Sequence, residues 1–295
     1  MVSGELGRRA VLSGLAAGAA GLALSTGQAA ATPRPQRRYE GKVVVITGAT
    51  SGIGKAAAIA FAREGAKVGF CGRREPLGRE VERDIRRAGG EATYVKADVR
   101  VPDQVESFVD GVVRKYGGLH VAFNNAGIQL PKPLHETTLE EWDATAETNT
   151  RGVFLAMKYE LPHMIRGGGG VILATGSANE FGTRPGLASY SASKATVGSL
   201  VRTAAIEYGP QGIRVAAISP GVTETGLVDA RRPPGITDEQ WAQFKAEYGR
   251  ANVDGLKRMA KPEEMASVAL ALASPDFSFL TGTSVVVDGG MLAGL

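Results

Sequence analysis

Tyr190 and Lys194 are the residues of this 295-residue chain whose types and spacing could exchange a proton with a ligand. They lie four positions apart in the segment Tyr190-Ser-Ala-Ser-Lys194, and this spacing places both on one face of a helix. A nearby ammonium favours an ionised phenol, so we expect Lys194 to lower the pKa of Tyr190 from its ordinary value near ~10. Such a tyrosine can serve as a general acid or base. Alone, the pair is a weak signal, and two solvent-facing side chains are the better interpretation of it.

Further polar residues are expected beside this pair. Ser177 stands thirteen residues before Tyr190, just past the apolar run Val171-Ile-Leu-Ala-Thr175. Asn149 is a polar residue in an otherwise packable helical stretch, and Asn124-Asn-Ala-Gly127 closes an earlier strand. Ligands of open α/β sheets bind at the carboxyl ends of the strands. We therefore expect these side chains to meet at one ligand-binding edge, with Gln129 and Asn179 flanking it.

The elements that position these residues alternate between strand and helix from Lys42 onward. The expected strands are Val43–Thr47, Lys67–Cys71, Ala92–Lys96, His120–Asn124, Val171–Thr175, Val215–Ser219 and Ser284–Asp288. The expected helices are Lys55–Glu64, Glu75–Ala88, Pro102–Tyr116, Thr138–Met164, Ser189–Tyr208 and Pro262–Ala273. This pattern predicts a doubly wound, Rossmann-type α/β fold, a parallel sheet of seven strands with helices on both faces. The least regular part, 222–261, is expected to form a lid or substrate-recognition loop.

A glycine turn follows the first expected strand, in Gly48-Ala-Thr-Ser-Gly52-Ile-Gly54. Glycines allow a sharp turn and close approach of a pyrophosphate, and the next helix begins with free N–H groups and positive potential. The turn predicts a dinucleotide site, although a purely structural turn would have the same sequence.

The second expected strand ends at Gly72, where an acid that holds the ribose 2′-hydroxyl would be expected. Arg73 and Arg74 follow, and guanidinium groups are suited to a 2′-phosphate. This favours NADP(H). The alternative, that one arginine stacks on adenine or faces solvent, leaves NAD(H) possible.

With these residues identified, the chain resembles the short-chain dehydrogenase/reductase family over about residues 40–290. The motifs that match in order are Thr-Gly-x-x-x-Gly-x-Gly at 47–54, Asp98-Val99, Asn124-Asn-Ala-Gly127, Asn149, Ser177, Tyr190-x-x-x-Lys194 and Pro220-Gly221. The resemblance implies an oxidoreductase that moves a hydride between a nicotinamide cofactor and a small alcohol or ketone, in a homotetramer. Family members include 3-oxoacyl-carrier-protein reductases and sugar, steroid and other secondary-alcohol dehydrogenases, so the substrate stays open.

The resemblance also implies residue roles. Tyr190 would be the proton donor in reduction, Lys194 would bind the nicotinamide ribose, and Ser177 would orient the substrate oxygen. Asn149 would hold a water that links Lys194 to solvent. With the glycine turn and the arginine pair included, the expected cofactor-binding residues are Gly48, Ser51, Gly52, Ile53, Gly54, Arg73, Arg74, Asp98, Val99, Asn125, Ala126, Gly127, Tyr190, Lys194, Pro220, Gly221, Val222 and Thr225.

Residues 1–38 differ from the catalytic domain expected at 39–295. An Arg8-Arg9 pair precedes a Gly/Ala-rich apolar run and then Gln28-Ala-Ala-Ala31, an arrangement that resembles a twin-arginine export signal cleaved after Ala31. The export signal predicts a periplasmic or extracellular protein. The alternative is a cytoplasmic protein in which these residues are a disordered extension or follow from an upstream start codon that is not the real one.

Charge and cysteine content exclude other classes. The whole net charge of +4 resides in residues 1–38, so the remaining chain is neutral in sum and predicts no nucleic-acid partner. The apolar run is too short to span a bilayer, so no membrane association is expected after signal removal. Cys71 is the single cysteine and lies in an apolar run, which predicts a buried structural thiol. Three scattered histidines predict no metal site. A dinucleotide-binding sensor or scaffold without turnover remains the alternative to an enzyme.

Overall fold

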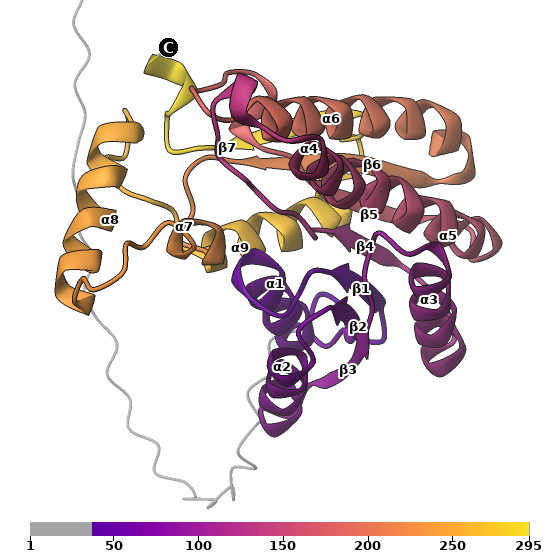
Figure 1. Cartoon of the computed structure of the whole chain (residues 1–295). Coiled ribbons are helices and arrows are strands. Elements are labelled where there is room, and N and C mark those ends of the chain that lie inside the picture. The colour runs from indigo at the N-terminus through magenta and orange to yellow at the C-terminus, as the bar shows by residue number, and fades with distance from the viewer. Residues whose placement is uncertain (1–36, 295) are drawn as a thin grey trace, which may run out of the picture. The chain divides into compact units, whose positions relative to one another are not determined.

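The computed structural model describes residues 37–294, which contain a seven-stranded parallel sheet (Figure 1). The strands are β1 (Val43–Thr47), β2 (Lys67–Gly72), β3 (Glu91–Lys96), β4 (Val121–Asn124), β5 (Gly170–Thr175), β6 (Ile213–Pro220) and β7 (Thr283–Val287). Their order in the sheet is β3-β2-β1-β4-β5-β6-β7. The doubly wound parallel sheet predicted from the sequence is confirmed.

Two layers of helices cover the sheet. One face packs against α1 (Gly52–Arg63), α2 (Glu75–Arg87) and α9 (Pro262–Ala273). The other packs against α3 (Pro102–Tyr116), α5 (Gly152–Arg166) and α6 (Ala188–Tyr208) (Figure 1). Within residues 37–294, no helix combines the length and apolar character that a membrane-crossing segment needs.

Strand β1 is buried on both faces and anchors the glycine turn in the middle of the sheet. Val44 and Ile46 point into one helical layer, and Val43 and Val45 point into the other. All four are at most 1% exposed. Burying an aliphatic side chain of this size contributes roughly 1.5–3 kcal/mol. Because β1 pairs with β2 on one side and β4 on the other, the order in which successive strands join the sheet reverses between β1 and β4, which opens a crevice at the carboxyl ends of these strands.

The stretch predicted as one helix over Thr138–Met164 is interrupted. It consists of α4 (Leu139–Ala146), a π-helical turn (Glu147–Arg151) and the first part of α5. The helical conformation continues on both sides of the turn, so a helix predicted from local sequence does not reveal the extra residue that a π-turn inserts.

Residues 222–261, expected from the sequence to form an irregular loop, hold two helices, α7 (Gly226–Asp229) and α8 (Asp238–Asn252). A capping box begins α8: Thr237 Oγ1 accepts from Gln240 N at 3.2 Å, and Gln240 Oε1 accepts from Thr237 N at 2.9 Å. Only Trp241 and Gly249 of α8 are buried. The helix therefore lacks the apolar stripe that would have predicted it from periodicity.

Candidate functional site

A cavity of about 440 Å³ lies at the carboxyl ends of the strands. Of the site residues predicted from the sequence, all except Gly54 and Asn149 line it. Gly54 lies behind the glycine turn, where an added Cβ would be 2.6 Å from Gly48 O. It permits close packing of α1 on the turn rather than contact with a ligand. Asn149 is fully buried beneath the cavity wall.

The glycine turn presents backbone donors to the cavity. Gly48 and Gly52 have φ values of +69° and +56°, which favour glycine. Helix α1 has no side-chain hydrogen bond at its N-cap, Ser51, and no acidic residue in its first turn. The first N–H groups of α1 therefore remain available, and an anionic diphosphate fits this donor set.

The end of β2 has no room for an acidic side chain. A Cβ added to Gly72 would lie 2.7 Å from the Thr50 methyl carbon. The Arg74 guanidinium donates to Thr50 Oγ1 at 2.9 Å and to Ser51 Oγ at 2.6 Å, and both Arg73 and Arg74 are exposed at the cavity. Two guanidinium groups therefore stand where an acid would bind a ribose hydroxyl.

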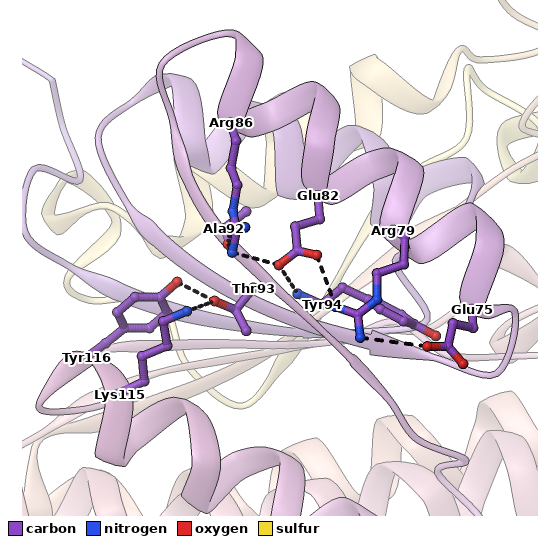
Figure 2. A network of polar contacts seen from close by, with 9 residues as sticks. All are labelled: Glu75, Arg79, Glu82, Arg86, Ala92, Thr93, Tyr94, Lys115 and Tyr116. Carbon is purple, nitrogen blue, oxygen red and sulfur yellow. Dashed lines mark hydrogen bonds and ion pairs between the residues drawn. The ribbon is translucent and has the colours of Figure 1, made fainter.

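A polar network between α2 and β3 holds this end of the site in place (Figure 2). The Tyr94 hydroxyl donates to Gly72 O at 2.7 Å, and Tyr94 N donates to Glu82 Oε1 at 3.2 Å. Glu82 also pairs with Arg79 at 3.2 Å and with Arg86 at 2.7 Å. The Arg79 guanidinium lies 5.3 Å from the centre of the Tyr94 ring. The network fixes the carbonyl that immediately precedes the two arginines of the site.

Asp98 lines the cavity but is already engaged. Its carboxylate accepts from Arg100 Nε at 3.1 Å and from an Arg100 terminal nitrogen at 2.7 Å. Hydrogen bonding to Arg100 lowers the pKa of Asp98 below its usual value. Asp98 Oδ1 also accepts from Arg100 N at 3.0 Å, so the side chain starts a turn as well as facing the ligand crevice.

Tyr190, Lys194 and Ser177 meet at the opposite part of the cavity. Tyr190 and Lys194 come from α6, and Lys194 Nζ lies 5.6 Å from the centre of the Tyr190 ring. Nζ donates to Thr175 O, the last residue of β5, at 2.7 Å. Ser177 follows β5, and its hydroxyl accepts from Asn179 N at 3.1 Å. The three side chains predicted to act together do lie together, and all are at most 9% exposed.

Burial dominates the protonation equilibria of this group. It lowers the pKa of Lys194 to about 8, against the opposing charge of Glu180. It raises the pKa of Tyr190, while the Ser177 hydroxyl and the positive charge of Arg231 act in the opposite direction. The pKa of Tyr190 is therefore raised, where the spacing alone predicts that Lys194 would lower it. The spacing of the two residues indicates a shared helix face but not the cost of burying both groups.

Asn149 lies in the π-helical turn Glu147–Arg151, and its side-chain amide connects this turn to two other parts of the structure. Its Oδ1 accepts from Ile128 N at 2.8 Å, and its Nδ2 donates to Ile128 O at 2.9 Å. Nδ2 also donates to Ser193 Oγ at 3.0 Å, beside Lys194 on α6. A single buried amide therefore connects the loop after β4 to the helix that carries Tyr190. π-turns are frequent at functional sites.

The remaining wall of the cavity is formed by side chains of several loops and of α8. Gln129 and Asn179, singled out from the sequence, are among them, and others are Arg184, Leu187, Val228, Arg231, Tyr248 and Met291. Neither Arg184 nor Tyr248 has a local sequence signal, because their positions depend on how distant segments fold together. Trp241 is buried and donates to Asp229 at 3.1 Å, outside the cavity lining, whereas Trp142 is 41% exposed on α4.

The other residues that could do chemistry are accounted for by packing. Cys71 is fully buried, and burial raises the pKa of its thiol to about 12, which fits the structural role predicted for it. In the part of the chain that the structure describes, His, Cys, Asp and Glu side chains form no group able to hold a metal ion.

Comparisons with known proteins agree with this geometry. Residues 48–292 match the family model described as Enoyl-(Acyl carrier protein) reductase. The chain is 37% identical to 3beta-hydroxysteroid dehydrogenase 1 of Eggerthella lenta, over 85% of this chain and 94% of that protein. It is 35% identical to glucose 1-dehydrogenase of Gluconobacter oxydans, over 88% of this chain and 95% of that protein.

Solved structures show the same similarity. Levodione reductase superposes with a TM-score of 0.81 at 32% identity, over 88% of this chain and 100% of that structure. A short-chain type dehydrogenase/reductase from Mycobacterium marinum superposes with a TM-score of 0.78 at 35% identity, over 87% and 97%. The sheet, the glycine turn, the Tyr190 group and these relatives agree: the chain belongs to the short-chain dehydrogenase/reductase family, oxidoreductases that use NAD(P)(H) and act on CH–OH groups.

Proposed function

We propose that this protein is an NADP(H)-preferring oxidoreductase that interconverts a secondary alcohol and a carbonyl compound, with Tyr190 as the catalytic acid and base. One observation carries the proposal. Tyr190, Ser177 and Lys194 line the same cavity as the glycine turn at the start of α1. A single bound dinucleotide can therefore place its reactive ring beside the phenol while its phosphates meet the N-terminus of α1.

Each side chain of the group has a part in the reaction. In reduction, Tyr190 Oη donates its proton to the carbonyl oxygen, and in oxidation it accepts the alcohol proton. The Ser177 hydroxyl hydrogen-bonds the same oxygen and stabilises the charge that develops on it. Lys194 Nζ places a positive charge beside the phenol ring. The bound nicotinamide supplies or takes up the hydride.

NADP(H) preference rests on the end of β2. Arg73 and Arg74 are exposed at the cavity, and the Thr50 methyl group fills the space that an acidic side chain at Gly72 would need. A 2′-phosphate gains charge-assisted hydrogen bonds from guanidinium groups, whereas a ribose hydroxyl gains less. A panel of secondary alcohols and ketones, assayed with both cofactors, measures this preference directly.

Tyr190→Phe tests the catalytic assignment. The variant keeps the ring and its packing but removes the proton donor, so we expect cofactor binding to persist and turnover to be lost. Cofactor binding is followed by NADPH fluorescence, and turnover by absorbance of the reduced nicotinamide. Unchanged turnover in Tyr190→Phe would refute the role of Tyr190. If the wild-type protein binds NADPH but turns over no member of the panel, the alternative of a sensor or scaffold is favoured.

The proposal includes a homotetramer. Several large apolar side chains are exposed, including Phe279 at 101%, Ile206 at 80% and Leu139 at 77%. Exposed apolar groups of this size favour burial between subunits. Sedimentation equilibrium of the full chain tests it, and a monomer at micromolar concentration would contradict it.

Export through a twin-arginine-like signal is a further part of the proposal, supported by the Arg8-Arg9 pair and the Ala-rich stretch that ends at Ala31. These residues lie outside the part that the structure describes. A cofactor-binding enzyme exported in folded form would carry its nucleotide with it. Cell fractionation and N-terminal sequencing test the proposal, and an unprocessed cytosolic protein would overturn it.

A further inference from the structure

Seven basic residues lie in the segment 222–261, and three of them, Arg231, Arg232 and Lys245, leave the charge of the substrate undecided at the level of sequence. The structure separates them. Arg232 pairs with Asp238 at 2.7 Å, and Lys245 lies 3.9 Å from Glu224. Neither of these two cations is among the residues that line the cavity. Arg231 is the third: it lines the cavity, and no carboxylate among the described residues forms an ion pair with it.

Arg231 extends across the cavity without an acidic partner among the described residues. Its terminal nitrogens donate to Gln129 Oε1 at 2.6 Å and to the Tyr248 hydroxyl at 3.3 Å, both uncharged. Gln129 follows β4 and Tyr248 belongs to α8, so these bonds orient the guanidinium between two walls of the cavity. The positive charge of Arg231 also lowers the pKa of Tyr190, which places it within electrostatic range of the reacting group.

Arg184 supplies a second guanidinium to the same wall. It is partly buried in the segment that joins Ser177 to α6, and it lines the cavity with Tyr190. Among residues 37–294, no carboxylate lies within ion-pair distance of it. Two cations that face one cavity repel each other unless an anion lies between them.

No acidic side chain offsets these charges in this part of the cavity. The one carboxylate found in the described lining is that of Asp98, which follows β3 and is held by Arg100. The part around Tyr190 therefore presents cations and neutral groups only. Guanidinium groups bind carboxylates and phosphates through paired, charge-assisted hydrogen bonds.

Resting on the oxidoreductase function proposed above, we propose that the substrate carries a carboxylate or phosphate group, which Arg231 and Arg184 bind while Tyr190 and Ser177 hold the reacting oxygen. Gln129 and Tyr248 act as positioning residues, because they fix the direction of the Arg231 guanidinium before the substrate arrives. A neutral substrate of the same shape leaves both guanidinium groups facing an uncharged surface. The anionic group therefore sets specificity separately from the alcohol or ketone that reacts.

Matched pairs of ketones test this proposal on the full chain. 4-Oxopentanoate and 4-acetylbenzoate are compared with their methyl esters, and glycerone phosphate with glycerone, all with NADPH. A charge-assisted hydrogen bond predicts kcat/KM about 10- to 100-fold higher for the anionic member, mainly through a lower KM. Preference in the carboxylate pairs or in the phosphate pair identifies the anion.

Arginine variants connect this preference to the two residues. Arg231→Gln and Arg184→Gln are each expected to raise the KM for the anionic ketone about 10- to 100-fold relative to the KM for its neutral partner. Arg250→Gln is the matched control, since Arg250 is exposed on α8 outside the cavity lining and its loss changes the net charge equally. The control is expected to retain the wild-type ratio of the two substrates.

Calorimetric titration of the NADP-loaded protein with each acid and its ester gives a readout that does not need turnover. Tighter binding of the acid, weakened in Arg231→Gln, supports the proposal even if these probes do not react. Equal binding and equal kcat/KM of anionic and neutral members, unaltered by either variant, would overturn it while leaving the oxidoreductase function intact. Loss of turnover with every ketone, with acid binding retained, would count against the proposed function instead.

Discussion

The Asn149 amide bonds both main-chain polar groups of Ile128, accepting from its N–H at 2.8 Å and donating to its carbonyl at 2.9 Å. Ile128 follows Gly127, whose Cα faces both Asn149 and Lys194: a Cβ added there would lie 3.4 Å from Asn149 Oδ1 and 3.7 Å from Lys194 Nζ. The Asn149–Ile128 pair therefore sets the distance between the loop after β4 and the lysine of the site. Asn149 therefore belongs to the site although it does not line the cavity.

Replacing Asn149 is expected to destabilise the protein. Asn149→Ala leaves two partly buried main-chain groups of Ile128 without their protein partners, at a cost of about 2–4 kcal/mol in the free energy of unfolding. Thr148→Ala is the control on the same π-turn, because the Thr148 hydroxyl is buried without a hydrogen-bond partner and its removal costs far less. Urea denaturation measures both values. Equal losses in the two variants would contradict the importance of the Asn149–Ile128 bonds.

Glu180 is expected to set the alkaline limit of activity. The pKa of Lys194 is about 8, lowered by burial and raised in part by Glu180. Activity that depends on the Lys194 ammonium is therefore lost as pH rises through this value. Glu180→Gln removes the carboxylate charge, so the alkaline limb of kcat/KM should move to lower pH.

The control for this prediction is Glu207→Gln, an exposed glutamate on the same helix α6. It should leave the pH profile of kcat/KM unchanged. A limb that stays in place in Glu180→Gln would show that Lys194 does not determine it.

Glu160 is expected to make the stability of the protein depend on pH. Burial raises its pKa from 4.5 to about 7, while Asn124 Nδ2 donates to Glu160 Oε2 at 2.9 Å. The folded protein therefore binds this proton more tightly than the unfolded chain, so stability falls as pH rises from about 4.5 through 7. The loss amounts to about 3 kcal/mol at most.

Glu160→Gln removes the titrating group and keeps a polar partner for Asn124. The variant should match the wild type near pH 5 and exceed it by about 2–3 kcal/mol near pH 8, in urea denaturation at both pH values. Glu106→Gln, at an exposed position of α3, is the control and should change neither value. A stability difference that is the same at both pH values would contradict titration of Glu160.

The arginines at the end of β2 are expected to control cofactor choice. Arg74→Ala removes a guanidinium that Thr50 and Ser51 hold at the cavity, so the Kd for NADPH should rise about 10- to 100-fold with little change for NADH. Arg87→Ala, at the far end of α2, is the control for loss of one exposed arginine. Fluorescence titration measures both cofactors. An equal loss of affinity for NADPH and NADH would contradict 2′-phosphate recognition by Arg74.

Much of the fold and of the site could be predicted from local sequence. The strand β1 is found at Val43–Thr47 as expected, and α3 begins and ends at Pro102 and Tyr116 as expected. A buried parallel strand or an amphipathic helix is recognised from the spacing of apolar residues within one short segment. The glycine turn and the spacing of Tyr190 and Lys194 are local features in the same sense. For this reason the sequence alone determined the sheet, the position of its ligand edge and the identity of the residues gathered there.

The tertiary structure decided what depends on contacts between distant segments. Gln129 and Arg231 are 102 positions apart, so their hydrogen bond, and the choice of Arg231 rather than Arg232 as the cation of the cavity, have no signature in either segment alone. The pKa of Tyr190 follows the same rule, because burial raises it, against the lowering effects of the Ser177 hydroxyl and the Arg231 charge, whereas the neighbour four positions away suggests a lowered value. Charge balance and desolvation depend on everything that surrounds a group in space. Spacing along the chain determines only which side chains share a face.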